Sequence, residues 1–254
     1  MLYKIFNSVI YLFLCNICAL NILSASELSQ KMKDEMHNLI EEYILGNPEI
    51  VLKALKLIET KQIVEQELRE KILIKENKDI IFSQAGVFYD PEQHLVIVSF
   101  IDFNCSFCKK SDAVLSRAIE KNPDITYLVK NFPILGETSV LAARAAIFLK
   151  NNEERQTYLN FVNLMMSNPS KITLKTINSI ARSSGSSLNI TLDKLKSSDI
   201  DNTLNENFRL SDVLEISGTP TLLINNKLYR GHIEGDNLDE IIKTYRGEIS
   251  KPQN

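Results

Sequence analysis

Two pairs of cysteines have the clearest chemical potential in this sequence. They are Cys15 with Cys18 and Cys105 with Cys108, and the 254 residues contain no other cysteine. Two thiols separated by two residues can close a disulfide and open it again, whereas four thiols could in principle bind a zinc ion. The sequence around each pair decides between these chemistries.

The first pair lies in a segment with the pattern of a secretory signal peptide. A single charge at Lys4 precedes an apolar run, and small residues follow at positions 24–26. We therefore expect residues 1–25 to be a cleaved signal peptide and the protein to be exported to the periplasm. The alternative is an uncleaved membrane anchor, but a spanning helix needs about 20 apolar residues, and this run is shorter and contains asparagine.

Cleavage would leave the pair at 105 and 108 as the only thiols of the mature protein. A disulfide across two intervening residues closes so short a loop that it adds little stability, so a redox role explains the pair better than a structural one. Zinc would need about two further ligands, and the three histidines, His37, His94 and His232, are scattered along the sequence. We expect neither a metal nor another cofactor.

The elements around the second pair should place it at the start of a helix. Residues 94–101 form a short apolar run rich in β-branched residues, which predicts a buried strand directly before Cys105. A helical pattern reaches to about residue 122, and residues 125–129 read as a second strand, so the three elements form a βαβ unit. The helix dipole and the free N–H groups would stabilise the thiolate of Cys105, with Cys108 as the shielded resolving thiol.

The rest of the second half alternates helical and β-like patterns, which makes the chain an α/β protein. Helical patterns cover residues 140–150, 153–166, 173–182, 199–215 and 237–245. Two β-like runs, 221–224 and 227–230, are joined by Asn225 and Asn226, which predicts a tight hairpin.

Residues 27–82 read as helix, interrupted at Gly46, Asn47 and Pro48. Here Asn47 is expected to cap the following helix, and Pro48 to occupy its first position. Beyond the break, apolar residues recur at spacings of three and four among Lys, Glu and Gln. Such a helix either packs across its own domain or pairs with copies of itself. We favour self-association, which predicts a homo-oligomer.

The overall charge excludes one class of partner. The sequence holds 29 Lys and Arg against 32 Asp and Glu, for a net charge of −3. Without a broad positive field, we expect no nucleic-acid partner.

Three motifs carry a resemblance to the DsbA family of exported thiol-disulfide oxidoreductases. They lie at residues 100–109, 131–145 and 218–224. The resemblance implies an α/β, thioredoxin-like fold over residues 85–254, with a helical insertion at about 138–196. It also implies a preceding N-terminal helical arm at residues 26–84, which resembles that of the ScsC- and Com1-like branch and would be an oligomerisation region.

The same resemblance implies roles for particular residues. Cys105 and Cys108 would form the redox disulfide, and Thr219 and Pro220 the cis-proline loop that offers its backbone to an extended substrate segment. The protein would oxidise reduced or unfolded exported proteins and be re-oxidised by a membrane or soluble redox partner. The alternatives are an oligomeric disulfide isomerase or reductase, and a non-catalytic, chaperone-like binding module with a structural disulfide.

Two departures from the family pattern alter these expectations. Strongly oxidising members carry a histidine between the cysteines, whereas this chain has Phe107, so we expect a less oxidising disulfide. Many relatives also bury a glutamate six residues before the first cysteine, where this chain has Ser99. Asp102 could transfer protons in its place, or it could simply cap the helix.

Overall fold

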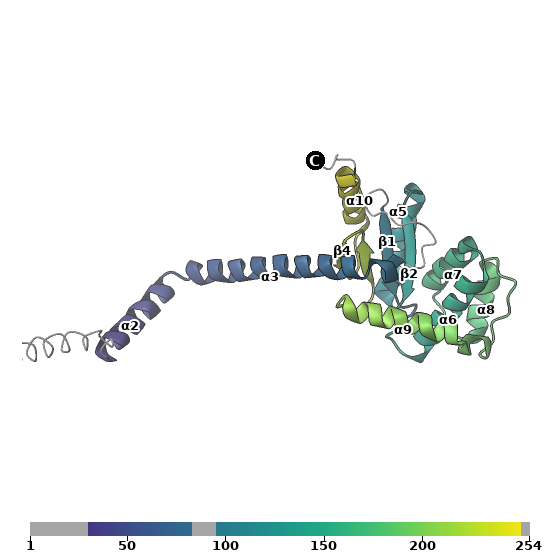
Figure 1. The fold of residues 1–254 in the computed structure, drawn as a ribbon, viewed down its shortest axis with the longest axis horizontal. Helices are drawn as coiled ribbons and strands as arrows, with labels where there is room; N and C mark the ends of the chain where they lie inside the picture. Colours follow the sequence, from purple (N-terminus) through teal and green to yellow (C-terminus); the bar gives the residue numbers. More distant parts are fainter. Residues whose placement is uncertain (1–29, 83–94, 250–254) are drawn as a thin grey trace, which may run out of the picture. The chain divides into compact units, whose positions relative to one another are not determined.

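The computed structural model describes residues 30–82 and 95–249 (Figure 1). The predicted signal peptide, with Cys15 and Cys18, therefore lies outside the described residues, as does His94. Within the described ranges, no helix combines the length and apolarity that a membrane crossing requires.

A four-stranded sheet forms the centre of the fold. The strands are β1 (Val96–Ile101), β2 (Thr126–Asn131), β3 (Thr221–Ile224) and β4 (Lys227–Arg230). Their order is β2-β1-β3-β4, with β1 parallel to β2 and antiparallel to β3. Every residue of β1 is buried, as its continuous apolar run predicts for a central strand.

Helices connect and cover these strands. α5 (Ser106–Lys121) joins β1 to β2, which confirms the predicted βαβ unit. A helical insertion separates β2 from β3, and α10 (Gly235–Ile249) follows β4. The insertion, predicted at about 138–196, contains α6 (Glu137–Asn152), α7 (Arg155–Ser167), α8 (Leu174–Ser183) and a short 3₁₀ helix (Lys194–Lys196). Between it and β3 lies α9 (Ser198–Val213). The predicted α/β, thioredoxin-like fold with a helical insertion is confirmed.

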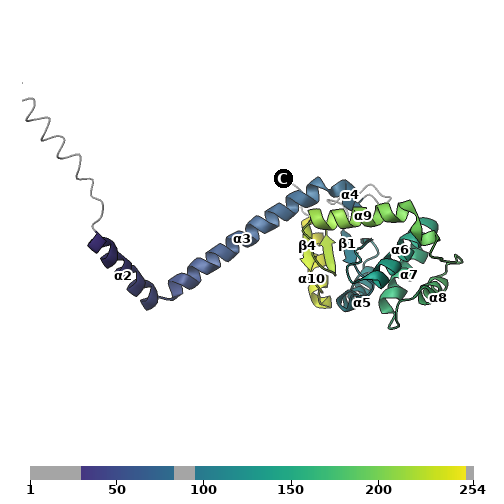
Figure 2. The same ribbon diagram turned by 90° about the horizontal axis from the view of Figure 1, so that it is seen from below.

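The sheet has an apolar core on each face. Ile97 and Val129 face a core that includes residues of α5, α6, α7 and α10. Val98 and Phe100 face a smaller core built with α4 (Lys78–Phe82) and α9. Figure 2 shows α4 and α9 on one side of the strands and α5 and α10 on the other. This layering holds the start of α5 at the end of β1.

The N-terminal helices are α2 (Gln30–Gly46) and α3 (Glu49–Glu76). The break between them falls where it was predicted, but Asn47 acts differently from the expectation. Its side-chain amide donates a hydrogen bond to the carbonyl of Tyr43 at 2.8 Å, so it closes α2. Carbonyl groups at the end of α2 lack partners within the helix, which explains this preference.

The chain separates into two compact units, the first ending at Ile63 and the second beginning at Val64. The sequence placed this boundary at residues 84 and 85 instead. The difference arises because Ile74, Ile81 and Phe82 are buried in the core on one face of the sheet. The end of α3 and the whole of α4 therefore belong to the sheet-containing unit.

Candidate active site

Cys105 lies at the junction between the loop after β1 and the start of α5. It is the N-cap residue of α5, and its sulfur accepts a hydrogen bond from the backbone N–H of Cys108 at 3.3 Å. Backbone N–H groups at a helix N-terminus stabilise negative charge, so a thiolate here has a donor already aimed at it. Cys105 is 7% exposed.

A second segment, distant in sequence, completes the surroundings of this sulfur. The Cys105 thiol donates a hydrogen bond to the carbonyl oxygen of Thr219 at 3.3 Å, and the Thr219–Pro220 peptide bond is cis. The Thr221 hydroxyl donates to the Gly218 carbonyl at 2.9 Å, which closes the loop on itself. The structure thus brings together the dithiol and the proline loop that the sequence named separately.

Cys108 lies deeper than Cys105. Its side chain is 1% exposed, and burial raises the pKa of its thiol to about 12, an effect that hydrogen bonding to Asp102 and Thr219 only partly offsets. Neither cysteine forms a disulfide in this structure. The buried sulfur therefore holds its proton at neutral pH, and the sulfur nearer the surface is the one that an incoming thiol can reach.

Asp102 fixes the loop that faces the start of α5. The residue is 1% exposed. Its carboxylate accepts hydrogen bonds from the backbone N–H of Asn104 at 2.8 Å and from those of Ile134 and Leu135 at 2.9 Å each. The capping prediction for this residue is wrong, because Cys105 itself caps α5. A role for Asp102 in proton transfer stays a prediction.

A buried acid that the sequence analysis missed lies one turn beyond Cys108. Asp112 belongs to the buried face of α5, and burial raises the pKa of its carboxyl to about 7. Its charge also raises the pKa of Tyr127, after the larger effect of burial. Ser99 lies buried on β1. The four-residue spacing from Cys108 was the signal that could have identified Asp112, since residues at that spacing share a helix face.

Exposed apolar side chains occur in the segments that form the site. Phe107, within the dithiol motif, is 56% exposed. Ile134 and Leu135, whose backbone N–H groups donate to Asp102, are 39% and 52% exposed. Exposed apolar groups near a reactive sulfur are suited to contact an unfolded polypeptide.

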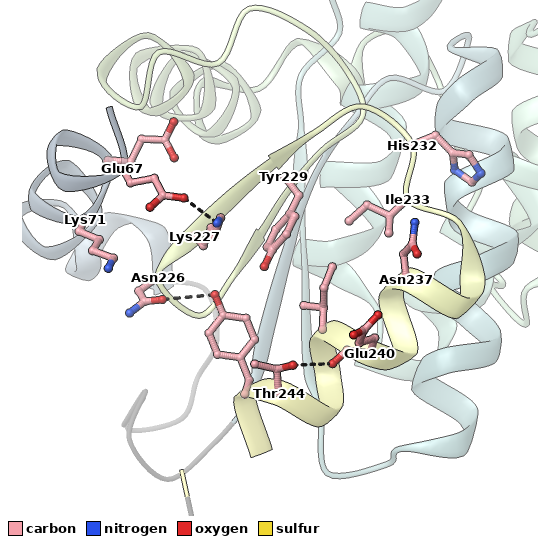
Figure 3. A pocket seen from close by; sticks show the side chains of 13 residues that line it. Glu67, Lys71, Asn226, Lys227, Tyr229, His232, Ile233, Asn237, Glu240 and Thr244 are labelled. Atoms are coloured by element: carbon pink, nitrogen blue, oxygen red, sulfur yellow. Dashed lines mark hydrogen bonds and ion pairs between the residues drawn. The ribbon is translucent and has the colours of Figure 1, made fainter. Parts of the chain in front are cut away.

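A cavity of about 690 Å³ lies away from the two cysteines. It is lined by the end of α3, by β4 and by α10, with Glu67, Lys227 and Glu240 among its polar residues (Figure 3). Neither cysteine lines it, so this cavity is separate from the candidate active site. In residues 30–82 and 95–249, no three His, Cys, Asp or Glu side chains are arranged to hold a metal ion.

Comparisons with known proteins agree with this geometry. A family model described as thioredoxin matches residues 90–244. No curated protein matches the chain. A linker-deletion mutant of Proteus mirabilis ScsC is 25% identical, with a TM-score of 0.62, and the match covers 89% of this chain and 100% of that one.

Two further solved structures extend the comparison. A periplasmic thioredoxin-like protein from Salmonella enterica serovar Typhimurium is 27% identical, with a TM-score of 0.55 over 66% of this chain and 95% of that one. The thiol-disulfide exchange protein α-DsbA2 from Wolbachia pipientis shares the fold, at 23% identity and a TM-score of 0.60 over 71% of this chain and 97% of that one. Because the family model spans more than half of the sequence, the chain belongs to the thioredoxin family, and its fold is that of the DsbA- and ScsC-like members.

Proposed function

We propose that this protein is an exported thiol-disulfide oxidoreductase that introduces or exchanges disulfide bonds in periplasmic or secreted proteins. One observation carries the proposal. The Cys105 sulfur lies at the start of α5, between the Cys108 N–H and the Thr219 carbonyl, with the second thiol buried behind it. The homology of the chain to thiol-disulfide oxidoreductases also supports disulfide exchange.

The reaction begins with the Cys105–Cys108 disulfide and a reduced client. A client thiolate attacks the Cys105 sulfur, a mixed disulfide forms, and the Cys108 sulfur leaves and takes up a proton. A second client thiolate then attacks the client sulfur of the mixed disulfide, and Cys105 leaves as a thiolate. The client loses two electrons and gains a disulfide, while the two cysteines gain both electrons. The Cys108 N–H stabilises the charge that develops on Cys105 as it leaves.

The site has the features that an unfolded client requires. Phe107, Ile134 and Leu135 offer apolar contacts, and the backbone of Thr219 can bind an extended client segment as an added strand. The expected partners are therefore reduced or unfolded exported proteins, together with a redox partner that restores the disulfide. Export is supported by the signal-like first 25 residues and by the periplasmic neighbour from Salmonella.

An oligomeric disulfide isomerase is a second candidate, favoured by the surface of α2. Several large apolar residues of this helix are exposed, and four of them recur at spacings of four, three and four residues: Met32, Met36, Leu39 and Tyr43. That spacing is typical of helices that pair with copies of themselves. An oligomer would surround a misfolded client with several active sites.

The test of the proposal is the oxidation of a reduced test protein by the oxidised enzyme. The Cys105→Ser variant should abolish oxidation, because no disulfide remains for a client thiolate to attack. The Ser106→Ala variant is the matched control, since it alters the neighbouring residue and retains both thiols. Oxidation by Cys105→Ser at the rate of the unmodified protein would rule out every catalytic role for the pair.

A further inference from the structure

The loop at residues 218–220, which faces Cys105, is held by backbone contacts with the end of β4 and the residue after it. Arg230, the last residue of β4, pairs with Thr221, which directly follows Pro220. Its neighbour Gly231 donates a backbone hydrogen bond to the Pro220 carbonyl at 2.8 Å. The guanidinium of Arg230 also donates to the carbonyl of Glu215 at 3.5 Å. Arg230 therefore contacts the chain both before and after the loop at residues 218–220.

Arg230 is in turn fixed by an acid from the end of α3. Its Nη1 lies 2.6 Å from Oε1 of Glu70, whose side chain is only 8% exposed, and Gln66 donates to the same oxygen at 3.0 Å. An ion pair with one buried partner is costly to break, because the charge that remains has lost its counter-ion. The position of Arg230 thus depends on Glu70.

We propose that Glu70 is a positioning residue for client binding, which acts through Arg230 on the loop that presents Thr219 beside Cys105. The route consists of three contacts: the Glu70 carboxylate with the Arg230 guanidinium, the N–H of Gly231, next to Arg230, with the Pro220 carbonyl, and the Thr219 carbonyl with the Cys105 thiol. The inference rests on the proposed function, since it assigns the Thr219 backbone to the client. It gives the end of α3 a part in the reaction, in addition to any role in self-association.

The same helix and the same strand provide a matched control. Glu67, one turn earlier on α3, binds Lys227 at 2.8 Å, and both side chains are more than 40% exposed. Figure 3 shows Glu67 and Lys227 pointing toward each other. Lys227 is at the opposite end of β4 from Arg230, beside the hairpin turn and away from the loop at residues 218–220.

The experiment compares Glu70→Gln with Glu67→Gln in the full-length protein, using two reactions. The first is mixed-disulfide formation with a reduced, cysteine-containing client peptide, and the second is alkylation of the reduced protein by iodoacetamide, which needs no contact with the loop. We expect Glu70→Gln to weaken the client reaction about tenfold through KM, which corresponds to about 1.4 kcal/mol. Alkylation of Cys105 should stay within about twofold, and Glu67→Gln should change neither rate by more than that.

Equal client rates for the two variants would overturn the inference. A parallel fall of the client and alkylation rates would also overturn it, because Glu70 would then act on the thiol or on the fold. If Glu70→Gln does not fold, Arg230→Lys provides the same test. It keeps the positive charge but lacks the two separate nitrogens with which Arg230 binds Glu70 and the Glu215 carbonyl. An unmodified protein that forms no mixed disulfide would contradict the proposed function, whereas equality of the two variants would contradict only the role of Glu70.

Discussion

At the scale of single residues, the site depends on buried groups whose partners are distributed along the chain. Asp102 binds backbone amides on both sides of the site, Cys108 is buried as a thiol, and Asp112 lies on the buried face of α5. Burial disfavours the charged forms of Cys108 and Asp112, as their raised pKa values show.

Asp112 should make the protein less stable as the pH rises. Its pKa is about 7 in the folded protein against 3.8 as the reference value, so the folded state holds the proton more tightly. Stability is therefore fully present below the lower value and is lost as the pH rises through the higher one. We expect Asp112→Asn to leave the free energy of unfolding nearly unchanged at about pH 4 and to raise it by roughly 2 to 4 kcal/mol at about pH 8.

Urea unfolding at the two pH values measures this difference. Asp193→Asn is the control, because the Asp193 side chain is 94% exposed. A stability gain for Asp112→Asn of the same size at both pH values would refute the assignment of the effect to ionisation.

Asp102→Ala should destabilise the fold at the active site. The change removes a buried, charged acceptor shared by the backbone amides of Asn104, Ile134 and Leu135. A hydrogen bond to a charged group contributes about 1.5 to 3 kcal/mol, and water can partly replace the lost acceptor, so we expect a loss of roughly 3 kcal/mol in the free energy of unfolding. Chemical denaturation measures it, and a loss below about 0.5 kcal/mol would show that Asp102 does not brace the two loops.

At the scale of elements, the end of α3 and α4 are integral to the sheet-containing unit. Ile81 is fully buried in the same core as Val98 and Phe100 of β1, whereas Leu57, earlier in α3, is 72% exposed. The region that the sequence described as one helical arm therefore serves two purposes. Its last part covers a face of the sheet, and its earlier part keeps large apolar side chains exposed.

Substitutions in these two parts should therefore lower the free energy of unfolding by different amounts. Ile81→Ala should lower the free energy of unfolding by about 2 to 4 kcal/mol, because it leaves a cavity in a packed core. Leu57→Ala should change it by less than about 0.5 kcal/mol. Thermal and urea unfolding of the two variants measure these values, and equal costs would show that α4 does not belong to the core.

The sequence predicted the elements that depend on local pattern. The β-branched run of β1 and the helical periodicity of α5 placed Cys105 at a helix start, and Asn225 with Asn226 placed the hairpin turn. These features follow from periodicity and turn chemistry among neighbouring residues.

Contacts between distant residues could not be predicted in this way. Glu70 and Arg230 are 160 residues apart, and Asp102 binds amides that are 32 and 33 residues away. Which side chains meet is decided by the order of the strands and by the packing of helices on them. The position of Thr219 beside Cys105 was available only through the family resemblance, for the same reason.

At the scale of the whole molecule, the two compact units suggest a division between chemistry and assembly. The sheet-containing unit holds the dithiol, and α2 in the first unit has exposed apolar residues at coiled-coil spacing. Exposed apolar surface of this extent is costly in water, which favours its burial against a second copy. We therefore expect the full-length protein to be a homo-oligomer.

Leu39→Glu combined with Tyr43→Glu should dissociate that oligomer. Both residues are exposed, so the change should leave the fold of each copy intact while it places charges in the apolar stripe. Light scattering measures the mass in solution, and Asn38→Glu, on the same helix, is the control. We expect the monomeric variant to keep dithiol oxidation and to lose the rescue of a scrambled substrate; an unmodified protein that is already monomeric would contradict this account.

In the proposed reaction, Cys105 is the sulfur that joins to the client. This role is tested most directly by incubating the Cys108→Ser variant with a client peptide activated as a mixed disulfide and mapping the trapped complex by mass spectrometry. We expect a stable complex with the peptide attached to Cys105, because no resolving thiol remains to release it. The absence of a complex under conditions in which free cysteine reacts with the peptide would show that Cys105 does not join to the client.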